Sequence, residues 1–192
     1  MTEKLMLLNP GHGGKDPGAI YKPTGLREHD VVAEICEKVM QTFRPAGMNK
    51  ILIQQTGKLQ QVIERANRCN PLPAIFVSVH CNSSWLKKPR GLQVYYRDAG
   101  SERLARCLFG GIGEQLGNDK TKWAKIVQCL FLPGSGTNYG VLRESKATAA
   151  VLVETDFISN PEVAAMMAMI TGDWIAKAAA GITNGLNRYV GS

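Results

Sequence analysis

Short apolar runs alternate with longer stretches of helical periodicity along this chain of 192 residues. The runs have the length of strands and lie at residues 5–8, 50–55, 74–80, 91–97 and 149–154. In the longer stretches apolar residues recur every three or four positions, first at Val31, Ile35, Val39 and Phe43. Strands joined by helices of this length predict right-handed crossovers and a mostly parallel sheet with helices on both faces.

Length and composition indicate one α/β/α domain over residues 1–192, since 44% hydrophobic and 20% charged residues are ordinary for a globular protein. We find no internal repeat, low-complexity segment or linker. No apolar segment approaches the roughly 18 to 20 residues that a membrane span needs, so we expect no membrane span.

The net charge of +7 predicts attraction to anionic partners. The basic residues are not interleaved with aromatic ones, which argues against nucleic acid and leaves an anionic cell-wall polymer as a fitting partner. The cysteines are odd in number, scattered and without a CxxC pair, at Cys36, Cys69, Cys81, Cys107 and Cys129. This pattern argues against a disulfide framework and a thiolate zinc site, and favours core residues and assembly in a reducing compartment.

Histidines and glutamates follow the ends of the predicted strands. His12 lies in a glycine-rich turn after the first run, and His80 ends the run at 74–80. Glu28 falls in the first turn of the first helix, and Glu154 ends the run at 149–154. Because ligands of open α/β sheets bind at the carboxyl ends of strands, we expect these side chains to share one site.

Two imidazoles and one carboxylate, with a fourth position open to water, form the ligand set of catalytic zinc. A further carboxylate beside that water serves as general base. Spacing leaves the third ligand open between Glu28 and His29, because neighbouring helical side chains diverge by about 100°. It also leaves Glu144 and Asp156 as rivals of Glu154 for the base.

Four segments resemble, in the same order, the signature blocks of the zinc-dependent N-acetylmuramoyl-L-alanine amidases of bacterial autolysins and phage endolysins. They are residues 10–19 (PGHGGKDPGA), 25–28 (GLRE), 78–83 (SVHCNS) and 151–162 (VLVETDFISNPE). Residues 140–145 also resemble the family's segment before its last strand. The resemblance extends over nearly the whole chain.

This resemblance implies a three-layer α/β/α sandwich with a mixed, mainly parallel sheet of about six strands. It implies one catalytic Zn²⁺ ion held by His12, Glu28 and His80, with Glu154 as the catalytic residue. The implied reaction is hydrolysis of the amide between N-acetylmuramic acid and the L-alanine of the stem peptide in bacterial peptidoglycan. Arg143 and Asn82 are further candidates for assisting the reaction or orienting ligands.

The chain also departs from the family pattern. Residues 55–58 (QTGK) replace an Arg-Thr-x-Asp run, Asp156 stands where a small residue is common, and Cys81 follows a ligand position. Strand alternation predicts that Cys81 points away from the metal and into the core.

Three functions other than that of an amidase are also compatible with parts of the sequence. A zinc peptidase would cut within the stem peptide, and a metal-free glycosidase would use Glu28 and Glu154. A wall-binding module with a degenerate site is disfavoured because all four candidate site residues are intact.

We expect the chain to act on the bacterial cell wall, on its extracellular or periplasmic side. The N-terminus lacks the features of a signal peptide, which predicts cytoplasmic synthesis with phage-type release, or a trimmed form. A sporulation or germination amidase is the other family role. No wall-binding repeat is recognisable, so such a domain would be separate or missing.

Overall fold

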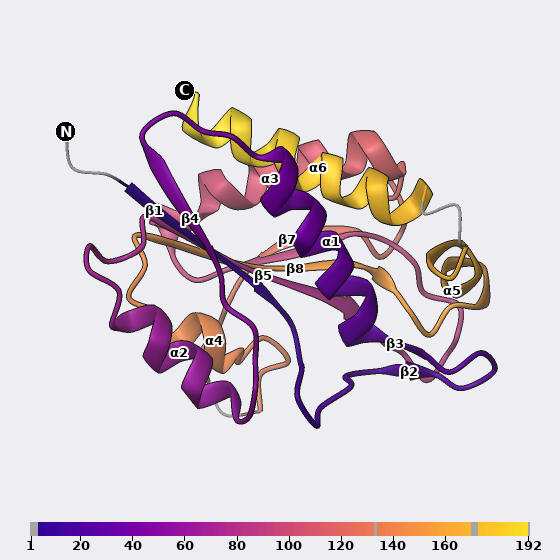
Figure 1. Cartoon of the computed structure of the whole chain (residues 1–192). Coiled ribbons are helices and arrows are strands. Elements are labelled where there is room, and N and C mark those ends of the chain that lie inside the picture. Colours follow the sequence, from indigo (N-terminus) through magenta and orange to yellow (C-terminus); the bar gives the residue numbers. More distant parts are fainter. Residues whose placement is uncertain (1–3, 133, 170–172, 192) are drawn as a thin grey trace.

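The computed structural model describes residues 4–132, 134–169 and 173–191; the rest of the expected domain over 1–192 lies outside the described residues. A mixed sheet of six strands lies between two layers of helices (Figure 1), which confirms the predicted fold class. In sheet order the strands are β4 (Met48–Leu52), β1 (Lys4–Pro10), β5 (Ile75–Asn82), β8 (Ala149–Phe157), β6 (Gln93–Tyr96) and β7 (Lys125–Gln128).

The direction of the strands brings four of their carboxyl ends to one edge of the sheet. Strands β4, β1, β5 and β8 run parallel, β6 runs antiparallel to β8, and β7 runs parallel to β6. All nine residues of β8 are buried, as expected for a central strand covered on both faces.

The two helical layers bury alternate residues of the same strands. One face carries α1 (Glu28–Thr42), α3 (Ala99–Leu116) and α6 (Asp173–Val190), and the other carries α2 (Leu59–Asn67) and α4 (Gly140–Arg143) (Figure 1). Val151 and Val153 of β8 pack into the core under the first layer, whereas Leu152 packs into the core under the second. Alternation therefore turns Glu154 towards the second face.

Several strand ends differ from the predicted runs, and two of them, in β4 and β8, have a clear physical reason. The run at 50–55 ends as a strand at Leu52. The next ladder bond would need an N–H group from Pro10, which proline lacks, and the Asn9 side chain donates to the Ile53 carbonyl oxygen instead, at 2.7 Å. Strand β8 continues three residues beyond Glu154, because the β5–β8 pairing resumes at Asn82 and Phe157 after an irregularity.

Sequence patterns did not predict the short hairpin of β2 (Ile20–Tyr21) and β3 (Leu26–Arg27) before α1. Helix α5 (Pro161–Met167) begins directly after Asn160, whose side chain caps it. All five cysteines are free, and no described helix is long and apolar enough to cross a membrane.

Helices α3 and α6 cross with their backbones in contact. A Cβ atom added at Gly111 would lie 2.5 Å from the carbonyl oxygen of Gly181 and 2.6 Å from the amide nitrogen of Gly185. Glycine at these positions allows the helices to approach closely, which brings Leu108 and Ile112 into the core between α3, α6 and the sheet.

We expect Gly111→Ala to lower the free energy of unfolding by about 1–3 kcal/mol, because the new methyl group overlaps backbone atoms that cannot move aside. The control is Gly110→Ala, whose Cβ would meet only the Arg188 Nη1 atom, at 3.4 Å. That change should be neutral or stabilising by up to about 1 kcal/mol, since alanine favours the helix. Urea unfolding measures both, and equal effects would contradict the close crossing.

Candidate metal centre

His12 occupies a strained turn directly after β1. Its φ of 63° is left-handed, and backbone bonds in both directions between Gly13 and Asp16 close the turn, at 2.8 and 3.1 Å. A Cβ atom at Gly11 would lie 2.3 Å from the His80 ring, so only glycine lets the two histidines approach. Their ring centroids are 5.1 Å apart.

Glu28 is the first residue of α1 and is held by backbone amides. Its amide donates to the Ala19 carbonyl at 2.8 Å, which joins the start of the helix to the segment entering the β2–β3 hairpin. Oε2 accepts from the Ala19 amide at 2.9 Å, and Oε1 accepts from the Cys81 amide at 3.0 Å. These bonds hold the buried carboxylate between Ala19, just before the β2–β3 hairpin, and Cys81, near the end of β5.

Both imidazoles meet the same carboxylate oxygen. His12 Nε2 lies 3.2 Å and His80 Nδ1 lies 3.1 Å from Glu28 Oε1. One ligand atom from each of the three residues lies within 4.8 Å of the others, so the group could hold a metal ion.

The hydrogen bonds of His12 favour a cation, either a proton or a metal ion, between its Nε2 atom and Glu28. Asp16 Oδ2 lies 2.9 Å from His12 Nδ1 and accepts its proton, which leaves the Nε2 lone pair directed at Glu28. A proton or a metal ion between His12 Nε2 and Glu28 Oε1 would bind to both of these atoms. The hydrogen bond to Glu28 raises the pKa of His12 to about 9. Burial acts to raise the pKa of Glu28, but the hydrogen bonds to His12 and His80 hold it well below its usual value.

The rival ligand His29 does not join this group. Its Nδ1 atom lies 3.1 Å from the carbonyl oxygen of Gly11. Of the two neighbours that spacing left open, the structure therefore brings Glu28, and not His29, to His12 and His80. That these three residues are the ligands stays a prediction.

Glu154 lies beside the group as a second, differently placed carboxylate. It is opposite His80 in the β5–β8 pair, it is buried, and its Oε2 atom has no hydrogen-bond partner among the described residues. Burial raises the pKa of Glu154 to about 7, where a carboxyl group can both accept and return a proton.

The rival bases have other partners. Asp156 Oδ1 accepts from the amides of Gly91 and Phe157, at 2.7 and 2.8 Å, so this carboxylate fixes the loop before β6. Glu144 pairs with Arg143 at 2.7 Å on the surface. Cys81 packs in the core, as predicted, with its Sγ atom 3.4 Å from Thr155 Oγ1.

A cavity of about 350 Å³ opens beside His12 and His80. Gln55 and Lys58 line it, so the segment that departs from the family pattern borders the site. Asn82 donates to Gln93 Oε1 at 2.9 Å, and Arg143 donates to Asn138 at 2.7 Å. Neither of these two candidates contacts the histidine–glutamate group through a described hydrogen bond.

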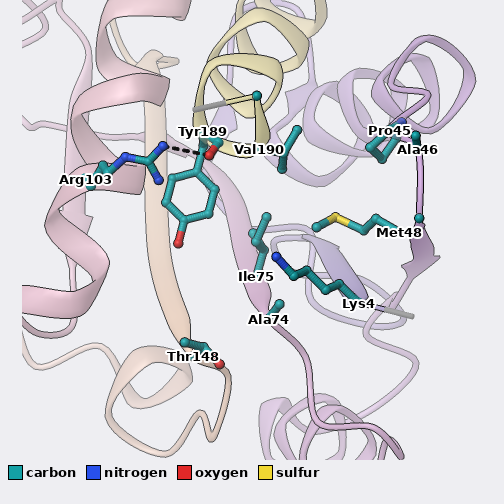
Figure 2. Close-up of a pocket in the computed structure, with 12 residues that line it drawn as sticks. Lys4, Pro45, Ala46, Met48, Ala74, Ile75, Arg103, Thr148, Tyr189 and Val190 are labelled. Carbon is teal, nitrogen blue, oxygen red and sulfur yellow. Dashed lines mark hydrogen bonds between the residues drawn. The ribbon is translucent and has the colours of Figure 1, made fainter. Parts of the chain in front are cut away.

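A larger pocket, of about 580 Å³, lies near the amino ends of β1 and β5 (Figure 2). Figure 2 shows Arg103 of α3 donating to the Tyr189 carbonyl oxygen, at 2.9 Å. None of the described residues that line this pocket is a histidine, cysteine or carboxylate, so it lacks the groups that the candidate metal centre has.

The fold and the site define a three-layer α/β domain with a candidate metal centre at the carboxyl edge of its parallel strands. The chain belongs to the N-acetylmuramoyl-L-alanine amidase family, whose profile matches residues 6–188. This confirms the resemblance seen in the sequence.

Individual relatives agree with the family assignment. The chain is 30% identical over 162 residues to N-acetylmuramoyl-L-alanine amidase LytC of Bacillus subtilis (strain 168), covering 82% of this chain and 30% of that protein. It is 36% identical over 169 residues to the endolysin of Bacillus phage SPP1, covering 85% and 58%. The structure of N-acetylmuramoyl-L-alanine amidase AmiC2 of Nostoc punctiforme superposes with a TM-score of 0.81 at 29% identity, covering 99% and 98% of the two chains.

We expect His80→Ala to weaken zinc binding by at least about 100-fold, because it removes one of three converging ligands. His29→Ala, the matched control, should keep zinc, since the His29 ring makes its described hydrogen bond to the Gly11 backbone carbonyl and not to the candidate metal centre. Competition with a chromophoric chelator measures both affinities. Zinc retained in full by His80→Ala, or lost from His29→Ala alone, would contradict the ligand set.

Proposed function

We propose that this chain hydrolyses the amide bond between N-acetylmuramic acid and the L-alanine of the stem peptide in bacterial peptidoglycan, with one zinc ion. The observation that carries the proposal is the convergence of His12, Glu28 and His80 beside the buried Glu154, whose Oε2 atom has no hydrogen-bond partner among the described residues. Membership of the amidase family supports the choice of bond. We further propose that residues 1–192 form a single catalytic domain.

The residues present suit zinc, which favours histidine and carboxylate ligands. Zinc held by His12, Glu28 and His80 would supply a Lewis acid that polarises the amide carbonyl and lowers the pKa of water towards neutrality. The hydrogen bonds from the Ala19 and Cys81 amides hold Glu28 ready for this role, and Asp16 holds His12.

Glu154 would act as the general base and then as the general acid. Its carboxylate would take a proton from the attacking water and deliver it to the departing nitrogen of L-alanine, which must be protonated to leave. Because Oε2 has no competing hydrogen bond among the described residues, the carboxylate is free to bind that water.

Charge and the cavity support a wall polymer as the partner. The net charge of +7 favours an anionic polymer, and the cavity beside the site presents Lys58 next to Leu59 and Tyr139. We propose action on the wall side of the membrane. The similarity to a phage endolysin supports phage-type release as the route.

Digestion of purified peptidoglycan, with and without chelator, tests the reaction by mass spectrometry of the products. An amidase releases stem peptides with a free amino group on L-alanine and leaves the lactyl carboxylate on the sugar, and the chelator should abolish this. Products that keep L-alanine on muramic acid would favour a zinc peptidase. New reducing sugar ends that form despite chelator would favour a glycosidase.

In the same assay we expect Glu154→Gln to retain zinc but lose about 10²- to 10⁴-fold in rate, because glutamine cannot accept the proton. Glu144→Gln makes the identical chemical change at a surface carboxylate paired with Arg143, and should keep the parent rate. A Glu154→Gln variant that lyses walls at the parent rate would remove Glu154 from the role of base.

We also expect kcat/KM to rise tenfold per pH unit on the acid side and to level off at or below about pH 7. The proposed base acts only when deprotonated, burial raises its pKa to about 7, and the positive charge of zinc lowers it from there. A pH series on soluble wall fragments measures this profile. A rate that increases only above about pH 8 would contradict the assignment.

A further inference from the structure

A buried row of polar side chains joins His80 to β1 and to the end of β4. Ser78 Oγ lies 2.9 Å from Asn9 Oδ1 and 3.2 Å from His80 Nε2. Ser78 is 0% and Asn9 2% exposed, in strands that are otherwise apolar at these depths. We propose that Asn9 and Ser78 are positioning residues, which fix the tautomer of His80 so that its Nδ1 lone pair faces the candidate metal. This inference rests on the proposed metal site.

The backbone fixes the orientation of the Asn9 amide. Asn9 Nδ2 lies 2.7 Å from the Ile53 carbonyl oxygen and 3.1 Å from the Pro10 carbonyl oxygen. Carbonyl oxygens only accept hydrogen bonds, so the NH₂ group must face them and Oδ1 must face Ser78. Pro10 has no N–H group to replace this donor.

Counting the protons in this row then shows whether Nε2 of His80 carries one. The two contacts of Ser78 Oγ need two protons, and the hydroxyl supplies one. Asn9 Oδ1 has none to give. The second proton must therefore lie on His80 Nε2, which donates to Ser78, while Ser78 donates to Asn9. The reverse arrangement would leave two buried acceptors facing each other without a proton.

A neutral His80 with its proton on Nε2 carries its lone pair on Nδ1. That atom lies 3.1 Å from Glu28 Oε1, the same oxygen that His12 Nε2 approaches. Without a metal ion, Nδ1 can also carry a proton that donates to Glu28 Oε1, and a metal ion would take the place of that proton while the proton on Nε2 stays. Asn9 and Ser78 thus orient His80 as Asp16 orients His12. The nitrogen that faces the candidate metal is Nδ1 in His80 and Nε2 in His12.

Each variant of the row has its own expected effect. Ser78→Ala leaves Nε2 without its partner, and we expect zinc affinity to fall by about 10- to 100-fold. Asn9→Ala releases the Ser78 hydroxyl to donate to Nε2, which should move the His80 proton to Nδ1 and also weaken zinc. Ser101→Ala is the control, because this serine is likewise 0% exposed but bonds Asp98 and the Ala150 amide, within the α3–β8 part of the fold.

The test uses the full chain with isotope-labelled histidine, before and after addition of zinc. Long-range proton–nitrogen correlation spectra at mildly alkaline pH report which nitrogen of His80 carries the proton, and chelator competition gives the zinc affinity. The expected result is a proton on Nε2 in the unaltered chain and in Ser101→Ala, and its loss from Nε2 in Asn9→Ala.

An Nε2 atom without a proton in the unaltered metal-free chain would overturn the inference, as would parent zinc affinity in both Ser78→Ala and Asn9→Ala. Failure of the unaltered chain to bind zinc would instead overturn the proposed metal site. The two failures are distinguishable, because the metal-free spectra decide the tautomer whether or not zinc binds.

Discussion

The contact of one oxygen, Glu28 Oε1, with two imidazoles is the interaction on which the rest of the site depends. A carboxylate buried at the start of α1 is costly unless its charge is compensated, and here the Ala19 and Cys81 amides and both histidines compensate it. The strained turn at His12, the hairpin before α1 and the end of β5 all meet at this residue. Removing Glu28 would leave those elements without their common partner.

Two buried carboxylates at one edge of the sheet have pKa values shifted in opposite directions. Hydrogen bonds keep the pKa of Glu28 low against the effect of burial, whereas burial raises the pKa of Glu154 to about 7. The Oε2 atom of Glu154 has no hydrogen-bond partner among the described residues. A carboxylate that stays charged suits a metal ligand, and one that titrates near neutrality suits a base. Separate environments thus give chemically identical side chains separate roles in the proposed mechanism.

Apolar periodicity was enough to predict a mostly parallel sheet between helical layers and to place His12 and His80 near the ends of strands, although β8 continues three residues beyond Glu154. It left open whether Glu28 or His29 turned inward, because that depends on contacts with Ala19 and Gly11 that are distant along the chain. The roles of Asp16, Asn9 and Ser78 were not predicted. For Asn9 and Ser78 the sequence held a signal, a polar residue within or directly after a buried apolar run, but only the three-dimensional contacts give it meaning.

The central claim is that two histidines and one glutamate hold a metal ion, and X-ray absorption at the zinc edge of the loaded chain tests it most directly. We predict two imidazole nitrogens and carboxylate oxygen at about 2.0–2.2 Å, with no sulfur. Three imidazoles would bring in His29, and a sulfur ligand at about 2.3 Å would bring in a cysteine. Either result would contradict the account.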